Sequence, residues 1–279
     1  MLDQLRQTLR ALERPALLED GAAALPLGIP EVDAALGGGL SCGALHEIAA
    51  LSEAHLPTAT GFVAGIARAA CAPSPRSSSS FRNARAASVS GIQNQSRSKR
   101  LDSGFALSAR PGMTGVLVWA AEDLGLAESG ALYGPGFDGC GIPPERLLTV
   151  SVAHRRDLLW AMEEALHCRG VSVVVGEMRE GALDGVAVRR LSLAAADSGA
   201  LALLLRAAPP EDASTAATRW IVGAAPSRSE EAHFTARLVR NRRGPLGSWI
   251  LTWSDDDGFA AHAQPLAAPA ADRPHRAVA

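Results

Sequence analysis

The sequence predicts an α/β protein built on a mainly parallel sheet with helices on both faces. Between residues 115 and 222, short apolar segments alternate with amphipathic helical segments, which is the pattern of βαβ units. The apolar segments are continuous rather than alternating, as expected for strands that are covered on both faces. With 279 residues, the chain is long enough for one large domain with appendages.

The first predicted element is an amphipathic helix over residues 1 to 20. Apolar side chains recur there at three- and four-residue steps, with Arg and Asp between them: Leu2, Leu5, Leu9 and Leu12. Such a helix docks either on its own domain or on a partner, and the sequence leaves both alternatives open.

The core begins near residue 25 with a turn, a short helix and a buried strand. Gly28 interrupts the chain, and Pro30 stands where a short helix begins. Residues 37 to 39 form a flexible glycine turn, and residues 44 to 49 are a buried strand. Residues 60 to 71 are apolar and small enough to form a core helix.

Residues 72 to 112 differ in composition from their surroundings. They contain four consecutive serines and many arginines, but few apolar groups. Such a segment buries too little surface to offset its ordering entropy, so we expect a disordered insertion between two core elements. A basic Ser/Arg segment can contact DNA, but a solvated loop is the favoured interpretation.

The core resumes after this insertion and continues to residue 253. The pattern predicts strands at 115–122, 146–152, 171–175, 200–205 and from 220, helices at 157–169 and 186–197, and a Gly/Pro-rich loop at 133–139. Two alternating runs flank a Gly-Pro turn between 235 and 253, which indicates a β-hairpin. Residues 254 to 279 are acidic and then Ala/Pro-rich, and we expect a disordered tail.

Composition excludes several classes of protein. The formal net charge of −2 argues against a strongly basic, general nucleic-acid binder. The four cysteines contain no C-x-x-C pair, so neither a zinc site nor a disulfide framework is expected: Cys42, Cys71, Cys140 and Cys168. The chain begins without an apolar signal region and contains no run of membrane-spanning length, so we expect a cytoplasmic protein without membrane contact.

Four landmarks in residues 25 to 253 resemble the RecA-type ATPase core. They are the opening Gly28–Ile48, the strand ending Trp119-Ala-Ala-Glu-Asp123, the Walker B-like strand Val173-Val-Val-Gly-Glu177 and the hairpin Arg240-Asn-Arg-Arg-Gly-Pro245. In RecA-type proteins the opening strand leads into the phosphate-binding loop, and the second strand ends in the catalytic glutamate. The resemblance implies a RecA-like, P-loop-type core.

Within this superfamily the chain most resembles the ImuA family of the bacterial SOS mutagenesis cassette. The Asp-Ala-Ala-Leu-Gly-Gly-Gly-Leu opening, the Gly-Ala-Leu-His-Glu strand and the Arg-Asn-Arg-Arg-Gly-Pro ending carry the resemblance. It implies an accessory protein of error-prone translesion synthesis that binds ImuB, an inactive Y-family polymerase, and supports a DnaE-type polymerase. RecA and DNA are further candidate partners. If the protein contacts either of them, we expect it to associate with the nucleoid when DNA damage is present. The alternative is a SulA-like division inhibitor that binds FtsZ.

The residues needed for ATP hydrolysis are largely missing. A phosphate loop uses glycine amides, a lysine and a hydroxyl for Mg²⁺, but the only lysine is Lys99 in the Ser/Arg-rich insertion, and Ala50–Thr58 contains no glycine. Gly176 occupies the Walker B acid position, and Glu177 comes one residue late and so points to the other side of the strand. Glu122 remains, but a lone carboxylate does not hydrolyse ATP. We therefore expect a degenerate nucleotide site, no cofactor and no ATPase activity; a live ATPase with an unorthodox site is the remaining alternative.

Few other residues qualify as site candidates. His46 and His55 lie too far apart for one helical face, and Ser41 beside Cys42 lacks a nucleophile-elbow motif. Alternation along the hairpin predicts that Arg237 faces away from Arg240. Three arginines cluster at its turn and are the candidates for partner or DNA contact, although a plain solvated turn fits equally well: Arg240, Arg242 and Arg243.

Overall fold

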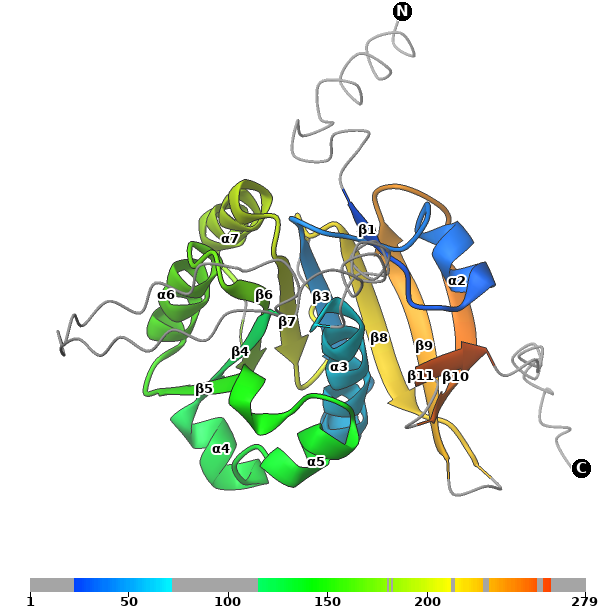
Figure 1. The fold of residues 1–279 in the computed structure, drawn as a ribbon, viewed down its shortest axis with the longest axis horizontal. Helices are drawn as coiled ribbons and strands as arrows, with labels where there is room; N and C mark the ends of the chain where they lie inside the picture. The colour runs from blue at the N-terminus through cyan, green and yellow to red at the C-terminus, as the bar shows by residue number, and fades with distance from the viewer. Residues whose placement is uncertain are drawn as a thin grey trace, which may run out of the picture.

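The computed structural model describes residues 23–71, 115–179, 181, 183–211, 214–227, 231–254 and 258–261 (Figure 1). The predicted helix over residues 1 to 20 and the predicted insertion at 72–112 lie outside these residues. The part of the predicted tail beyond residue 261 also lies outside them.

A nine-stranded sheet forms the centre of the protein. Its strands lie in the order β11 (Gly258–Ala261), β10 (Gly247–Ser254), β9 (Ala232–Asn241), β8 (Thr218–Ala224), β3 (Leu45–Ala50), β7 (Leu201–Arg206), β6 (Val171–Met178), β4 (Val116–Glu122) and β5 (Leu147–Val152). The six strands from β8 to β5 are parallel, and β9, β10 and β11 extend the sheet with antiparallel pairs. The predicted α/β core with a mainly parallel sheet is therefore confirmed.

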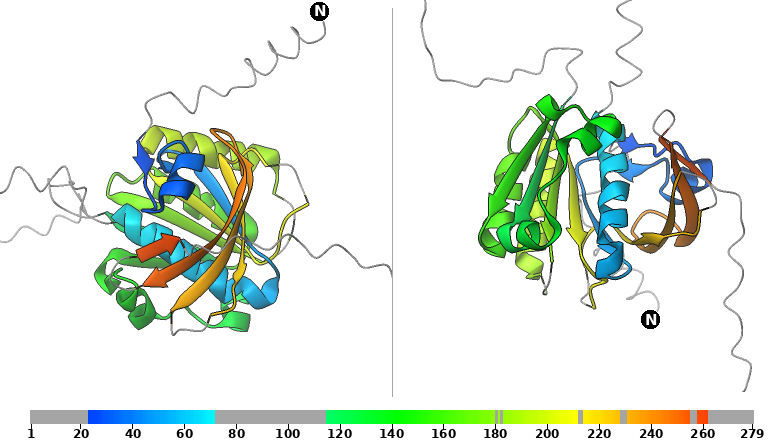
Figure 2. Two further views of the ribbon diagram at one scale, coloured as in Figure 1. Left: turned by 90° about the vertical axis from the view of Figure 1, so that its right-hand side faces the viewer. Right: turned by 90° about the horizontal axis from the view of Figure 1, so that it is seen from below.

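Helices cover both faces of the parallel strands. α3 (Leu56–Cys71) packs on one face, and α6 (Arg155–Leu166) and α7 (Gly185–Ser198) pack on the other (Figures 1 and 2). A small two-stranded sheet, β1 (Ala24–Leu25) and β2 (Leu40–Ser41), flanks the short helix α2 (Pro30–Ala35). Within the described ranges, no helix combines the length and hydropathy needed to cross a membrane.

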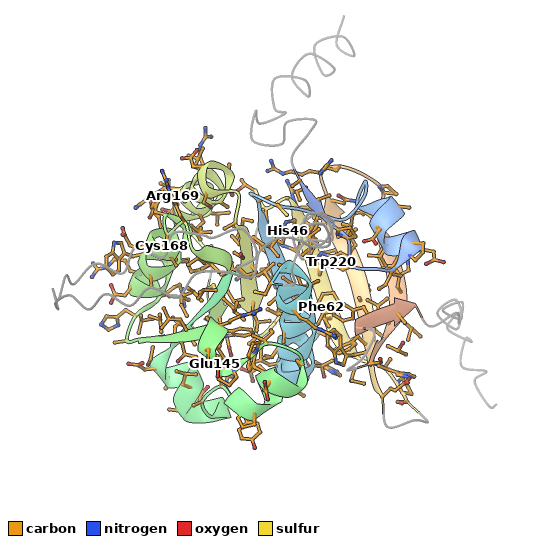
Figure 3. The ribbon with its side chains drawn as sticks, viewed as in Figure 1. His46, Phe62, Glu145, Cys168, Arg169 and Trp220 are labelled. Atoms are coloured by element: carbon orange, nitrogen blue, oxygen red, sulfur yellow. The ribbon has the colours of Figure 1, made fainter. Side chains whose placement is uncertain are left out.

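Each face of the sheet has its own apolar core. On the α3 face, the fully buried Phe62, Trp119 and Trp220 are among the largest side chains of the core. The Phe62 and Trp220 rings lie 5.9 Å apart where α3 crosses the sheet (Figure 3). On the other face, Leu158 and Met162 of α6 pack into a second buried cluster with residues of α7 and the strands. Burial on both sides explains why the parallel strands are continuous apolar runs.

The segment predicted as a Gly/Pro-rich loop instead contains helical turns, and in this respect the prediction was wrong. α4 (Asp123–Ser129) follows β4 directly, and α5 (Gly134–Gly139) begins with a proline in its first turn. Proline is tolerated at that position because the N–H that it lacks has no intrahelical partner there. Phe137 holds the turn in place, since its buried ring packs edge-on against Trp119 at 5.4 Å.

The ordered core extends beyond residue 253, into the segment predicted as a disordered tail. β11 pairs with β10 and carries Phe259 against α3. The Phe259 ring lies 5.2 Å from Phe62 and 4.9 Å from Trp253, and it lies so close to Gly65 that any side chain there would overlap it. Burial of this single aromatic residue explains why a short, polar-flanked segment forms a strand.

A bulge in β9 overturns the predicted orientation of Arg237. Arg237 pairs with Ile221 and Arg240 pairs with Arg219, and the register shifts between Arg219 and Trp220. Partners in a ladder share a face, and Arg219 and Ile221 lie two residues apart on one strand. Arg237 and Arg240 therefore lie on the same face. They are three residues apart in sequence, but one of the intervening residues is the extra residue of the bulge, so the pair behaves like residues two apart in a regular strand.

Candidate functional site

The connection between β3 and α3 occupies the position of a phosphate loop. It is a single 3-10 turn, Glu53–His55, which leads directly into α3 at Leu56 and Pro57. Pro57 has no backbone N–H to offer an anion. His55 is a structural residue, since its Nδ1 accepts a hydrogen bond of 3.1 Å from the backbone N–H of Ala224 in β8.

The two acids singled out in the sequence lie at the carboxyl ends of neighbouring strands but on opposite faces of the sheet. Glu122 ends β4, where its Oε2 accepts the backbone N–H of Arg179 at 3.3 Å and its Oε1 lies 3.8 Å from Nε of Arg155. Glu177 lies on the α3 face, where its Oε2 accepts Nε1–H of Trp119 at 3.0 Å. Burial raises the pKa of the Glu177 carboxyl, while Trp119 and Arg179 oppose this shift.

Gly176, at the Walker B acid position, faces α6 instead of α3. A Cβ at this position would overlap the sulfur of Met162 in the second core. It is therefore Glu177, one residue later, that faces the same side of the sheet as the β3–α3 connection, and the prediction that Glu177 points away from the nucleotide side was wrong.

Arg179 lies between two cavities at this edge of the sheet. Its Nη2 donates to Gly125 O at 3.3 Å and to Ser129 Oγ at 2.6 Å, and lies 3.7 Å from the Glu128 carboxylate. Arg179 and Glu53 line both cavities. One cavity measures about 500 Å³ and lies between α3, the α4–α5 segment and Glu177. The other, about 410 Å³, is lined by Glu122, His154 and Arg155 among others.

The arginine cluster of the hairpin turn lies beside β2, near the amino-terminal end of β3, away from both acids. Arg240 Nε donates to Ala216 O at 3.2 Å, and Arg243 Nη1 donates to Ser41 Oγ at 3.0 Å. Arg242 is half-buried, and desolvation together with the charge of Arg240 lowers its pKa. Of the three, Arg243 is the most available to a partner, because its side chain is exposed.

Asn241 explains how the turn keeps its shape. Its side-chain amide donates to Ala35 O at 2.8 Å and to Pro245 O at 3.0 Å, while its oxygen accepts the backbone N–H of Arg243 at 3.1 Å. The asparagine thus ties the hairpin turn to the end of α2. It is the residue of the Arg-Asn-Arg-Arg-Gly-Pro segment with the clearest structural role.

His46 is a buried core residue. Its Nε2 lies 3.0 Å from Ser41 O and its Nδ1 lies 2.8 Å from Thr218 Oγ1. A carbonyl oxygen can only accept, so Nε2 carries the proton and Nδ1 accepts from the hydroxyl. Burial lowers the pKa of His46 to about 4. Across the described ranges, no group of three or more His, Cys, Asp and Glu side chains is placed to hold a metal ion.

Two of the four cysteines are held as unreactive thiols. None of the four is in a disulfide. Burial raises the pKa of Cys42 and raises that of Cys71 to about 11, so both remain protonated thiols at neutral pH.

Sequence reasoning missed the cavity of about 500 Å³ and the position of Arg179. The side chains that line the cavity come from distant parts of the chain. Glu53 and Arg179, for example, are separated by 126 positions. The one available signal was the Glu-Met-Arg sequence at the end of an otherwise apolar strand.

Comparison with solved structures assigns the class of this fold. The chain is similar to the crystal structure of the RadB recombinase, with a TM-score of 0.50 over 85% of this chain and 99% of that one, at 11% sequence identity. Together with the parallel sheet and the β3–α3 junction, this similarity defines a RecA-like α/β protein. The chain matches no family model.

Curated relatives give the family. Over 175 residues the chain is 30% identical to Protein ImuA of Caulobacter vibrioides, both in strain NA1000 / CB15N and in strain ATCC 19089 / CIP 103742 / CB 15. Each alignment covers 57% of this chain and 68% of the relative. The chain belongs to the ImuA family, a RecA-like family associated with SOS mutagenesis.

Proposed function

We propose that this chain is a non-catalytic accessory protein of damage-induced, error-prone translesion synthesis. In this role it binds an ImuB-type inactive Y-family polymerase and supports an error-prone DnaE-type polymerase. Membership of the ImuA family and the RecA-like core support the pathway. The RecA-like core acts as a scaffold for partners in this proposal.

The observation that carries the non-catalytic part is the β3–α3 connection. Hydrolysis of a nucleoside triphosphate requires a loop that cradles the phosphates and a cation that neutralises them. Here the connection is a 3-10 turn that contributes the carboxylate of Glu53 and contains neither glycine nor lysine, and α3 then begins with Leu56 and Pro57. A negative charge at this position repels a triphosphate.

Partner binding is tested by affinity capture from a DNA-damaged culture. The tagged full-length chain is expected to capture the ImuB-type protein. A truncation after Ala261 is the matched comparison, because a cut at residue 253 would remove Phe259 from the core. Loss of capture on truncation would assign the contact to residues 262–279, and retained capture would assign it to the rest of the chain. Capture of FtsZ instead of the ImuB-type protein would support the division-inhibitor alternative.

The arginine turn is tested in the same assay by charge reversal. Arg243→Glu alters the exposed arginine of the turn, and Arg237→Glu changes another exposed arginine, on the hairpin strand. If the turn contacts the partner, the first variant loses capture and the second retains it. Equal capture by both variants would remove the turn from the interface.

The non-catalytic part is tested by calorimetric titration with MgATP and by phosphate release. We expect neither saturable binding nor release above that of the buffer. Saturable binding with hydrolysis would overturn this part of the proposal, while leaving the partner assay as an independent test of the pathway.

A further inference from the structure

The geometry points to a small-molecule site in the cavity of about 500 Å³ beside Glu177, here called the α3–α5 cavity. Its ligand would be a small amphiphilic cation: an apolar body that carries one amidinium, guanidinium or ammonium group. This inference goes beyond the proposed role in translesion synthesis and does not depend on it.

The walls of the cavity are mostly apolar. α3 contributes Leu56 and Ala64, and the α4–α5 segment contributes Leu126, Leu132 and Phe137. The volume of about 500 Å³ lies within the range of pockets that hold drug-sized ligands. Tyr133 lines the same cavity and is 72% exposed, so an aromatic ring is available to cover a ligand.

Glu177 supplies the polar contact at the end of the cavity. Its hydrogen bond to Trp119 uses Oε2 and fixes the carboxyl group, which leaves Oε1 to accept from a ligand. Trp119 is itself fixed, because it is fully buried and packs against Phe137. The acceptor is therefore preorganised, which reduces the entropy cost of binding.

The charges of the cavity favour a cation over an anion. Glu53 and Glu177 contribute two carboxylates. Among the described residues that line the cavity, Arg179 is the only cation; Nη2 of its guanidinium is engaged by Gly125 O and Ser129 Oγ and lies near the Glu128 carboxylate, while its Nε is buried without a hydrogen-bond partner. Glu53 and Glu177 outnumber this one cation, so a phosphate or carboxylate ligand would meet a net negative charge, whereas a cation would form a charge-assisted hydrogen bond with Glu177.

The test is calorimetric titration of the full chain with three probes of the same shape and different charge: benzamidine, benzamide and benzoate. We expect benzamidine to bind saturably, benzamide at least about tenfold more weakly, and benzoate not at all, because only the cation forms a charge-assisted contact. Similar affinity for all three probes, or no binding of benzamidine, would overturn the inference.

Two variants assign the binding to this cavity. Glu177→Gln should abolish the preference for benzamidine over benzamide, while Glu145→Gln, an exposed glutamate that does not line the cavity, should preserve it (Figure 3). Ala131→Trp places a bulky side chain on an exposed position of the cavity wall and should weaken all binding. If Glu177→Gln does not fold, Ala131→Trp still tests whether the probes bind in the α3–α5 cavity, and the probe series still tests whether a cation is preferred. Benzamidine binding that neither variant changes would overturn the assignment.

Discussion

The buried histidine of β3 makes the stability of the fold dependent on pH. His46 accepts a hydrogen bond from Thr218 at 2.8 Å, and the Thr218 hydroxyl in turn accepts Nε1–H of Trp220 at 3.1 Å. A second proton on the imidazole would occupy Nδ1, which could then no longer accept the hydrogen bond from Thr218. Burial lowers the pKa of His46 from 6.5 to about 4, with the hydrogen bond to Ser41 O opposing the shift, while the unfolded chain keeps the ordinary value.

The sign and size of the effect follow from this difference in pKa. A lowered pKa in the folded state means that the stabilisation is present in full above pH 6.5 and is lost as the pH falls towards 4. At about 1.4 kcal/mol per pKa unit, the shift corresponds to roughly 3 kcal/mol in total. Of this, about 2 kcal/mol is lost between pH 7.5 and pH 5.

The measurement is urea unfolding at pH 7.5 and pH 5 for three proteins. In His46→Gln, the amide can still donate to Ser41 O, but the side chain does not titrate in this range. Its decrease in stability between the two pH values should be smaller than that of the wild type by about 2 kcal/mol. The exposed His167→Gln variant should behave like the wild type. An unchanged pH dependence in His46→Gln would refute the reasoning.

Three further substitutions test other parts of the structure. Glu47→Ala should lower the free energy of unfolding by about 3 to 5 kcal/mol, because it removes the buried carboxylate 2.6 Å from Arg219; a loss below about 1 kcal/mol in urea unfolding would contradict this. Gly176→Asp puts an acid at the position that the sequence suggested for Walker B, but the side chain is forced against Met162 on the α6 face, so we expect a lower melting temperature that Mg²⁺ does not raise; stabilisation by Mg²⁺ would show that the acid reaches a metal site. Phe259→Ala should cost about 3 to 5 kcal/mol, and a thermal midpoint equal to that of the wild type would argue against the packing of β11 on α3.

The parallel core could be predicted because burial on both faces leaves a clear signal in the sequence. The segment 200–205 is apolar throughout, and β7 (Leu201–Arg206) is buried at every position. The order of the strands leaves no such local signal. That β3 lies between β7 and β8 was not predicted, since periodicity reports burial and not which strands are neighbours.

The errors share a physical cause, which is that distant contacts override local composition. Glycine and proline around Tyr133 indicate a loop, yet Phe137 folds the segment into α5 by packing on Trp119. The acidic residues after Trp253 indicate a tail, yet Phe259 brings the chain back onto α3. The bulge in β9 is set by pairing with β8, so strict alternation misplaced Arg237.

The candidate sites were predicted unevenly for the same reason. The arginines of the hairpin turn are adjacent in sequence, so their proximity was predictable. The opposite orientations of Gly176 and Glu177 follow from strand alternation alone. The cavity beside Glu177 required knowledge of which helices cover β6, and no pattern in the chain specified this.

The central position of β3 has a consequence for how the chain folds during its synthesis. β3 ends at Ala50, but its two neighbours end at Arg206 and Ala224. At about 5 to 20 residues per second, the ribosome needs roughly 10 to 35 s to add the second neighbour after β3 is made. Until β7 is complete at Arg206, the wholly apolar second half of β3 has neither strand partner, and until Ala224 it still lacks β8. The nascent chain is therefore a candidate client for chaperones until the codons for β8 have been translated.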